Sequence, residues 1–383
     1  MNNTIKLAVA SALLAAASSA NAGIMIPAGD WTLDIGGNVN AYYTSTRQSG
    51  SLVIGNTPLG LSNDAGSTTS NITTGLLPNF LSVSGKTRQN DLDVGFTISI
   101  NPGSSNTGPL SGTSQENRQA FLTFGDASWG TIKLGKDLGI YASDAILSDM
   151  TLLGVGSGAG ALAGGTTTLG RIGTGFMYAD WKSQVAYSSP NWNGFSFTAG
   201  VTQAWNGSGN TLRGGSEPAF EGKASYAWAG DFAGKVWVSG ITQNMESLND
   251  RANAWDIGAN VNVAGFGLTG YYGQGEGTGT TILFNKGYAG TQARDSDDWY
   301  VQGTYALPGV GTKLGLSYGQ STLDAVNAAD AANEEENTMW TVGAYHPLTK
   351  HLNLVAEYSD VKREVGVLEG KSKTVALGAI LFF

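Results

Sequence analysis

The sequence has no cysteine, only two histidines and a small share of charged residues. Without cysteine the chain has no disulfide, no thiolate metal site, no cysteine nucleophile and no lipid-modified N-terminal cysteine. Charged residues make up 13% of the 383 positions, whereas soluble domains average roughly 25%. Nine prolines are too few for proline-rich disorder, and an aromatic content of 10% argues for a folded chain.

Basic residues are outnumbered by acidic ones, which limits the partners of the chain. The formal net charge at pH 7 is −9. Proteins that bind nucleic acid without sequence preference carry a basic surplus that neutralises the phosphate backbone. We therefore expect no nucleic-acid partner. Glycine is abundant instead, with 56 residues, about twice its ordinary share of roughly 7%.

Long hydrophobic runs are also missing: beyond residue 22, no stretch of about 18 apolar residues could span a membrane as a helix. Residues 1–22 are typical of a secretory signal, with Lys6 before an apolar run and a cleavage site at Ala20-Asn21-Ala22. A buried N-terminal helix is the alternative for this segment. Export without a helical anchor leaves the periplasm, the medium or an outer-membrane barrel.

Apolar and polar residues alternate persistently along the chain. In residues 92–100, for example, every second residue is Leu, Val, Phe or Ile, and the residues between them are polar or small. A membrane strand needs this pattern, because one face meets lipid and the other meets the lumen. The mid-strand charges all fall on the polar parity: Asp34, Asp93, Asp256 and Glu357. This agrees with a cost of about 2 to 4 kcal/mol for a charge that faces lipid at the bilayer centre.

About sixteen such runs can be counted, and the parity of the run at 232–243 is ambiguous. The runs lie near residues 31–43, 79–88, 91–101, 117–125, 129–136, 182–189, 194–203, 219–229, 232–243, 253–263, 266–273, 297–306, 312–321, 336–345, 351–360 and 371–383. The long connections between them lie near 44–78, 102–116, 137–181, 204–218, 244–252, 274–296, 322–335 and 361–370. Short and long connections alternate, as in a barrel with tight periplasmic turns and long extracellular loops. We therefore predict an all-β, transmembrane antiparallel β-barrel of 16 strands, residues 23–383, with both termini on the periplasmic side.

Tryptophan and tyrosine cluster at the ends of the runs, as in the aromatic girdles at the two membrane interfaces. A soluble β-sandwich or solenoid is the alternative architecture, because it also alternates. It gives no reason for strands of about ten residues, a regular loop rhythm and an aromatic C-terminus together.

Three stretches resemble the general porin family of Gram-negative bacteria, in its neisserial and proteobacterial trimeric branch. They are residues 117–136 (NRQAFLTFGDASWGTIKLGK), 186–197 (AYSSPNWNGFSF) and 344–359 (AYHPLTKHLNLVAEYS), followed by the aromatic end LGAILFF at 377–383. The resemblance implies a trimer and a third loop, 137–181, that folds into the lumen. It also implies that Phe383 is read by the barrel-assembly machinery. The chain departs from the family pattern at Lys136-Asp137, where the family usually has Arg-Gln.

The third loop carries several charged residues, and basic side chains on polar-parity strand positions could face it. Opposed acidic and basic rows at a narrow pore set the preference for ions and oriented solutes. The candidate constriction residues are Asp137, Asp144, Asp149 and Arg171 on the loop, and Lys86, Arg88 and Lys133 on the strands. Arg118 is added because it matches the family's Asn-Arg pair, although it falls on the apolar parity. The alternative is that the acidic residues only solvate a surface loop.

We expect no enzymatic activity, because both histidines, His346 and His351, belong to one short turn on the predicted periplasmic side. A His-dependent hydrolase at the outer leaflet would need one at the opposite rim. The sequence thus predicts an outer-membrane porin for passive diffusion of small hydrophilic solutes and ions, without cofactor. Expected partners are outer-membrane lipid, lipopolysaccharide and two further copies of the chain. A channel selective for phosphate, an organic acid or a sugar is one alternative, and a non-conducting structural barrel is another.

Overall fold

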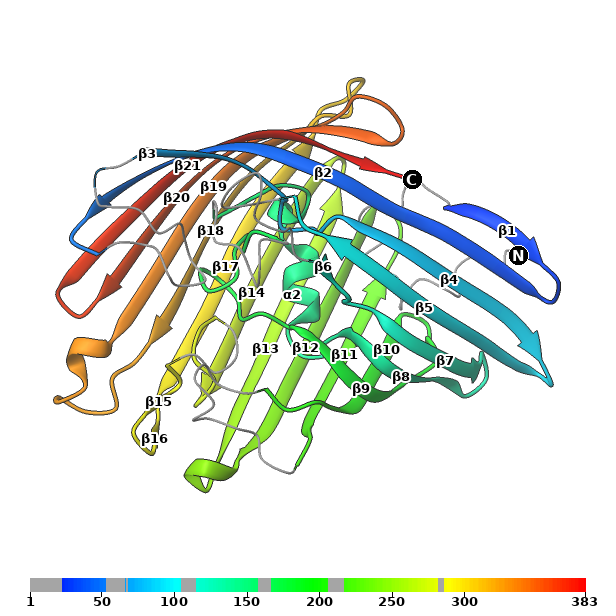
Figure 1. Cartoon of the computed structure of the whole chain (residues 1–383), viewed down its shortest axis with the longest axis horizontal. Helices are drawn as coiled ribbons and strands as arrows, with labels where there is room; N and C mark the ends of the chain where they lie inside the picture. The colour runs from blue at the N-terminus through cyan, green and yellow to red at the C-terminus, as the bar shows by residue number, and fades with distance from the viewer. Residues whose placement is uncertain are drawn as a thin grey trace.

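The structure is a computed structural model that describes residues 23–52, 66, 68–104, 115–157, 167–205, 217–281 and 286–383. Within these residues, sixteen antiparallel strands close into a barrel (Figure 1). The strands are β2 (Trp31–Gly50), β4 (Phe80–Gln89), β5 (Leu92–Pro102), β7 (Ala120–Asp126), β8 (Gly130–Leu138), β9 (Trp181–Ser188), β10 (Phe195–Thr202), β11 (Ala219–Trp228), β12 (Phe232–Met245), β13 (Asp250–Val263), β14 (Phe266–Glu276), β17 (Asp295–Ala306), β18 (Lys313–Leu323), β19 (Glu335–Pro347), β20 (Leu352–Val365) and β21 (Leu368–Phe382). Each predicted run corresponds to one of them. The predicted signal, 1–22, lies outside the described residues.

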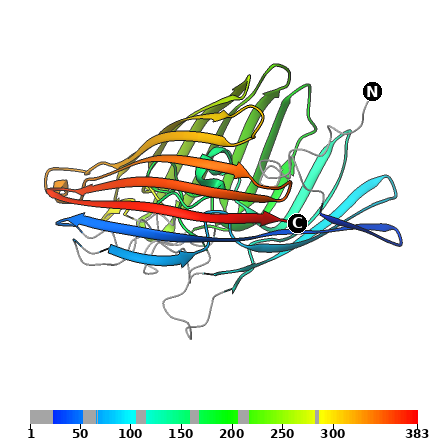
Figure 2. The same ribbon diagram turned by 90° about the horizontal axis from the view of Figure 1, so that it is seen from above.

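The barrel closes where the first long strand meets the last. Residues 38–50 of β2 pair with β21, and residues 32–38 of β2 pair with β4 on its other side. Figure 2 shows β2 and β21 running side by side. The backbone N–H of Phe383 donates to the carbonyl of Gly37 at 3.1 Å, and the N–H of Gly37 donates back at 2.9 Å. The C-terminal residue is therefore part of the seam, as is the short strand β1 (Ile24–Ala28), which pairs with the start of β2.

Further short elements lie outside the sixteen barrel strands. They are β3 (Thr68–Thr73), which pairs with β2, β6 (Gln115–Glu116), which pairs with β5, the hairpin of β15 (Tyr288–Ala289) and β16 (Gln292–Ala293), and the 3-10 helices η3 (Glu246–Leu248) and η4 (Ala331–Asn333). No helix in the described part of the chain is long and apolar enough to cross a membrane.

Tight turns join the strands at one end of the barrel, and β1 and Phe383 lie at this end (Figure 1). Most of the longer connections lie at the other end. The prediction of long connections at 244–252 and 361–370 is wrong, because the flanking strands continue past the predicted limits. Met245 pairs with Asp250 across η3, and Val365 pairs with Leu368 across a two-residue turn. Gly366 has a φ of +55°, the left-handed backbone that a tight turn requires.

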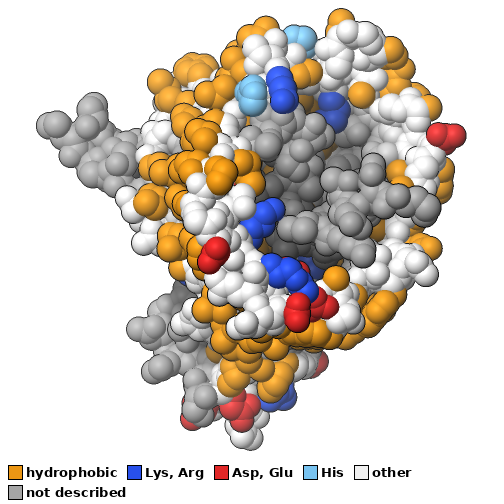
Figure 3. All heavy atoms as spheres, turned by 90° about the vertical axis from the view of Figure 1, so that its right-hand side faces the viewer, with side chains coloured by type: hydrophobic (Ala, Val, Ile, Leu, Met, Phe, Trp, Pro, Cys, Tyr) orange, Lys and Arg blue, Asp and Glu red, His pale blue; other side chains and the backbone are white. Residues whose placement is uncertain are grey.

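Side chains on the strands alternate between the outside and the inside of the barrel. Val39, Leu268 and Leu316 point outward and are 59%, 62% and 60% exposed in the isolated chain. Asp256 and Glu357 point inward and are at most 4% exposed. Figure 3 shows hydrophobic side chains over the outer wall, with Lys and Arg side chains around the opening at the short-turn end. The outer wall is therefore suited to lipid, which covers apolar surface that water would otherwise meet.

Two belts of aromatic side chains flank this apolar wall. Towards the long-loop end, Trp255 contacts Tyr272 at a ring-centre distance of 5.8 Å, and Trp340 contacts Tyr358 at 5.2 Å. Towards the short-turn end, Phe266 stacks on Tyr305 at 4.2 Å. Aromatic rings with a polar edge favour the two membrane interfaces. The belts confirm the predicted girdles.

The connection between β8 and β9 folds into the barrel instead of extending from it. It contains α2 (Ser143–Ser148) and η2 (Met150–Leu153), and α2 lies inside the ring of strands in Figure 1. Its apolar residues pack against the inner wall in one buried cluster. The cluster includes Ile146, Leu152, Val155, Ile172 and Phe176 of the loop, and Tyr42, Trp237, Tyr300, Met339 and Val355 of the wall. The expected inward fold of the third loop is confirmed.

Glycine on the wall allows the loop to approach closely. A Cβ atom at Gly319 of β18 would lie 2.7 Å from the carbonyl oxygen of Thr174, and one at Gly315 would lie 2.7 Å from the sulfur of Met150. Both glycines face inward on β18. Part of the glycine excess therefore provides room for the inserted loop.

Candidate pore constriction

Two wall carboxylates hold the inserted loop by its backbone. Glu221 of β11 accepts hydrogen bonds from the backbone N–H groups of Ile140 and Tyr141 at 2.7 and 2.9 Å. Glu357 of β20 accepts from the N–H groups of Val155 and Gly156, also at 2.7 and 2.9 Å. Hydrogen bonds to a charged acceptor are stronger than neutral ones. The loop is thus tied to two walls that are far apart in the sequence.

A third wall residue, Gln302 of β17, ties the middle of the loop. Its side-chain oxygen accepts from the N–H of Met150 at 2.9 Å, and its side-chain N–H donates to the carbonyl of Ser148 at 2.6 Å. Ser239 of β12 accepts from the N–H of Ala142 at 3.1 Å. The wall therefore satisfies backbone groups along the loop that would otherwise be buried without partners, as burial requires.

Asp144 of α2 is the charged loop residue that meets basic side chains of the wall. Its carboxylate lies 3.2 Å from Nζ of Lys223 on β11 and also pairs with Lys235 on β12. Nζ of Lys223 donates in addition to the hydroxyl of Ser143 at 2.9 Å. Burial opposes ionisation of Asp144, but the charges of the two lysines hold its pKa below the ordinary value. Two ammonium groups thus share one carboxylate beside the lumen.

Asp149 and Arg171 stabilise the loop from within. Asp149 caps η2, because its carboxylate accepts from the N–H and the hydroxyl of Thr151 at 3.0 and 2.6 Å. Burial raises the pKa of Asp149, and the charge of Arg171 opposes this rise. Arg171 is fully buried and donates to the carbonyl of Met339 at 2.9 Å and to the hydroxyl of Ser317. Both residues lie in the contact between loop and wall, not on a water-lined surface.

Lys133 and Asp137 form a pair on β8, and Arg118 is paired separately with Glu116 at 2.7 Å. Lys133 pairs with Asp137, which also accepts from the side-chain amide of Gln119 at 3.0 Å. Arg118 is 5% exposed and packs over the ring of Trp181 at 5.7 Å. The apolar parity predicted for Arg118 does not apply, because β7 begins at Ala120 and the strand alternation does not reach residue 118.

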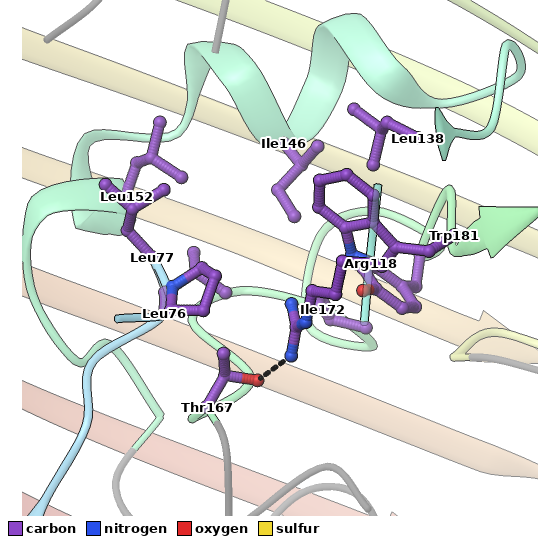
Figure 4. A pocket seen from close by; sticks show the side chains of 11 residues that line it. Leu76, Leu77, Arg118, Leu138, Ile146, Leu152, Thr167, Ile172 and Trp181 are labelled. Atoms are coloured by element: carbon purple, nitrogen blue, oxygen red, sulfur yellow. Dashed lines mark hydrogen bonds between the residues drawn. The ribbon is translucent and has the colours of Figure 1, made fainter. Parts of the chain in front are cut away.

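Figure 4 shows Arg118 at the edge of a small apolar cavity between the loop and the wall, where it donates to the hydroxyl of Thr167 at 3.4 Å. The cavity is lined by Leu76, Leu77, Leu138, Ile146, Leu152, Ile172 and Trp181, among others. Its volume of about 20 Å³ has room for little more than one water molecule. It is therefore a packing defect rather than a solute path.

Lys86 and Arg88 are placed away from the inserted loop. Both lie in the last residues of β4, near the tight turn to β5, and both are exposed. Arg88 forms ion pairs with Asp93 and Asp126, each at 2.9 Å, at the short-turn end. The structure therefore brings these two residues to the mouth of the barrel and not to α2.

Lys223 and Lys235 also face the loop, but they are not among the residues predicted from the sequence. Lys223 lies on the inward parity of β11 with Glu221, which the alternation could have indicated. Lys235 lies on the strand with ambiguous parity, where Trp237 and Ile241 are apolar but point inward to the loop. In the residues that the structure describes, no group of three or more His, Cys, Asp or Glu side chains is arranged to hold a metal ion.

Comparisons with known proteins agree with this architecture. A sequence model of the Gram-negative porin family matches residues 8–365. A comparison with curated protein sequences found no match.

Several solved structures share the fold at low sequence identity. The outer membrane channel DcaP of Acinetobacter baumannii is 17% identical with a TM-score of 0.69, covering 95% of this chain and 100% of DcaP. An anion-selective porin from Comamonas acidovorans is 15% identical with a TM-score of 0.64, covering 92% of this chain and 100% of that porin. The trimer form of OmpT from Vibrio cholerae is 14% identical with a TM-score of 0.57, covering 92% and 99%.

Proposed function

The chain belongs to the Gram-negative porin family and is an outer-membrane porin, and on this premise we propose that it mediates passive diffusion of small hydrophilic solutes and ions. The observation that carries the proposal is the connection between β8 and β9, whose described residues 139–157 and 167–180 are held inside a closed barrel with polar and charged side chains on its inner wall away from the loop contact. Hydrogen bonds to Glu221, Gln302 and Glu357 hold the loop inside the lumen. The loop therefore narrows the lumen although it would not need to be stable by itself. Water and solutes would pass through the space between the loop and this inner wall.

The narrowest part of the path is assigned to the surroundings of α2. Lys223, Lys235 and Lys133 line it with partly exposed ammonium groups, and the buried carboxylates of Asp144 and Asp137 are their partners. Asp149, Arg171 and Arg118 hold the loop in place, and Lys86 and Arg88 carry positive charge at the short-turn mouth. The eight residues predicted from the sequence thus divide into lining, anchoring and mouth positions.

The mature chain is proposed to begin at Gly23 in the periplasm, after cleavage behind Ala22, and to insert with its long loops outward. Phe383 is proposed as the residue that the barrel-assembly machinery reads. Lipid and lipopolysaccharide surround the barrel, and three copies form a homotrimer, as the trimer form of OmpT suggests. We assign no catalytic function and no cofactor, because His346 and His351 lie at the short-turn end, in β19 and just before β20.

Planar-bilayer recording of the purified protein tests the proposal. We expect stepwise currents that rise linearly with voltage and with the concentration of each solute. Currents that saturate with one solute would support a selective channel for phosphate, an organic acid or a sugar. Absence of current from correctly folded protein, shown by faster gel mobility before heating than after, would support a structural barrel and overturn the proposal.

A further inference from the structure

Seven carboxylates of the inner wall and the inserted loop are shielded from water, whereas Asp93 at the short-turn end is exposed. None of seven such side chains is more than 6% exposed: Asp137, Asp144, Asp149, Glu221, Asp256, Asp298 and Glu357. Several are held by donors of the protein itself, as Glu221 is by Lys182 at 2.5 Å and by the hydroxyl of Thr202 at 2.7 Å. Asp180, at the end of the loop, accepts from Nε1 of Trp205 at 2.9 Å. An ion in the lumen therefore cannot touch the buried carboxylates.

Several inward lysines, in contrast, have partly exposed side chains, although Lys182 is buried against Glu221. The side chains of Lys235, Lys223 and Lys133 are 31%, 21% and 20% exposed. Lys86 is exposed, and Lys313 lies on the inward parity of β18, 5.3 Å from the ring of Tyr345. Neither Lys86 nor Lys313 has a carboxylate partner among the described residues. Selectivity at a narrow pore follows from the groups that line it, and beside α2 the partly exposed charged groups are the ammonium groups of Lys223 and Lys235.

The pair of lysines beside α2 offers the best-defined contact for a solute. Lys223 and Lys235 share the single carboxylate of Asp144, so the three groups carry one net positive charge. Each ammonium has three N–H donors. Lys223 donates to Ser143 and forms an ion pair with Asp144, and Lys235 donates to Asp144. Lys235, the more exposed of the two, therefore keeps donors for a group in the lumen.

The negative net charge of the whole chain is compatible with positive charge beside α2, because many acidic residues lie outside the lumen. Asp295, Asp297 and Glu336 occupy the outward parity of β17 and β19 beyond the aromatic belt, and Asp91 and Asp231 lie in tight turns. Surface charges that are separated by more than about 8 Å in physiological salt are largely screened from one another. The charge that a permeating ion meets is thus local.

We propose that the lumen prefers small anions to cations, and that Lys223 and Lys235 beside α2 are the residues that set this preference. The proposal rests on the porin function argued above and names its solute class. The ligand chemistry is that of a small anion such as chloride, inorganic phosphate or a short carboxylate, which accepts hydrogen bonds from ammonium groups.

The reversal potential in a potassium chloride gradient tests the proposal. We expect a chloride-to-potassium permeability ratio above one for the native protein. Lys223→Gln and Lys235→Gln should each lower the ratio about twofold, because one elementary charge at about 8 Å, screened by salt of about 0.1 M, acts with opposite sign on chloride and potassium. Asp144→Asn should raise it about twofold, because both ammonium groups lose their counter-charge. Lys373→Gln is the matched control, since Lys373 lies on the outer face of β21 and pairs with Asp360.

The outcomes separate this proposal from the porin function. A native ratio at or below one would overturn anion preference while leaving a conducting porin. An unchanged ratio in folded Lys223→Gln and Lys235→Gln variants would overturn the assignment to these lysines. Absence of current would overturn the porin function itself. Addition of inorganic phosphate should reduce the chloride current of the native channel more than that of the Lys235→Gln variant. An equal reduction in both proteins would show that phosphate does not bind to Lys235.

Discussion

Replacing Glu357 by alanine should release the inserted loop from the β20 wall. Its carboxylate accepts from two consecutive backbone N–H groups, of Val155 and Gly156, at 2.7 and 2.9 Å. A hydrogen bond to a charged acceptor contributes about 1.5 to 3 kcal/mol, so loss of both weakens local docking by about 3 to 6 kcal/mol. Hydrogen exchange at these amides should therefore accelerate by about 100- to 10,000-fold. Both N–H groups donate to the same oxygen, Oε2, so Glu357→Gln can keep both bonds through its side-chain oxygen and should cost less than Glu357→Ala.

Hydrogen exchange read by mass spectrometry, with single-channel conductance beside it, measures this effect. The peptide that contains Ile140 and Tyr141 is the internal control, because Glu221 holds it independently. Glu336→Gln is the matched variant, since Glu336 lies on the outward parity of β19. Conductance should rise in Glu357→Ala as the loop loosens. Unchanged hydrogen exchange at Val155 and Gly156 together with unchanged conductance would show that Glu357 does not hold the loop.

Three further predictions follow from the same geometry. Gly319→Ala places a Cβ against Thr174 and Arg171 and should lower the free energy of unfolding by about 1 to 3 kcal/mol through overpacking. The temperature at which heating changes the gel mobility should then be lower than in the native protein. An equal transition temperature would contradict the close approach of loop and wall. The folded pKa of Asp144 lies below its ordinary value of 3.8, so the stabilisation by Lys223 and Lys235 is present above about pH 4 and lost as the pH falls through the folded pKa. The conductance of the native protein should therefore change in strong acid, whereas the Asp144→Asn variant should lack this change. Identical profiles of conductance against pH for the two proteins would exclude Asp144 as the titrating group. Removal of Phe383, which pairs with Gly37 at the seam, should lower the yield of heat-modifiable barrel in the outer membrane, and an undiminished yield would argue against its importance.

The strands could be predicted from the sequence because alternation is a local property. Residues 92–100 and 255–263 show it without interruption, and both are strands with the expected outward face. The pattern fails where the inner wall is itself apolar. Trp237 and Ile241 point inward because the loop packs on them, which obscured the parity of Lys235.

The loop contacts could not be predicted, because they join residues that are far apart in the sequence. Glu357 binds amides about 200 residues away, and nothing near position 357 or 155 encodes that partner. The position of Arg88 differs from the predicted one beside the third loop for a similar reason. Its partners, Asp93 and Asp126, lie on neighbouring strands at the short-turn end. Parity indicated which side of the wall a residue faces, but not how far along the lumen it meets the loop.

The absence of cysteine makes one measurement especially direct. In a Lys235→Cys variant, the single thiol lies on the inner face beside α2, whereas in Val238→Cys it lies on the outer face of the same strand, where Val238 is 46% exposed in the isolated chain. A water-soluble, charged thiol reagent added during bilayer recording should reduce the single-channel conductance of Lys235→Cys and leave that of Val238→Cys unchanged. No effect on Lys235→Cys, or an equal effect on both variants, would contradict a water-filled path beside the inserted loop.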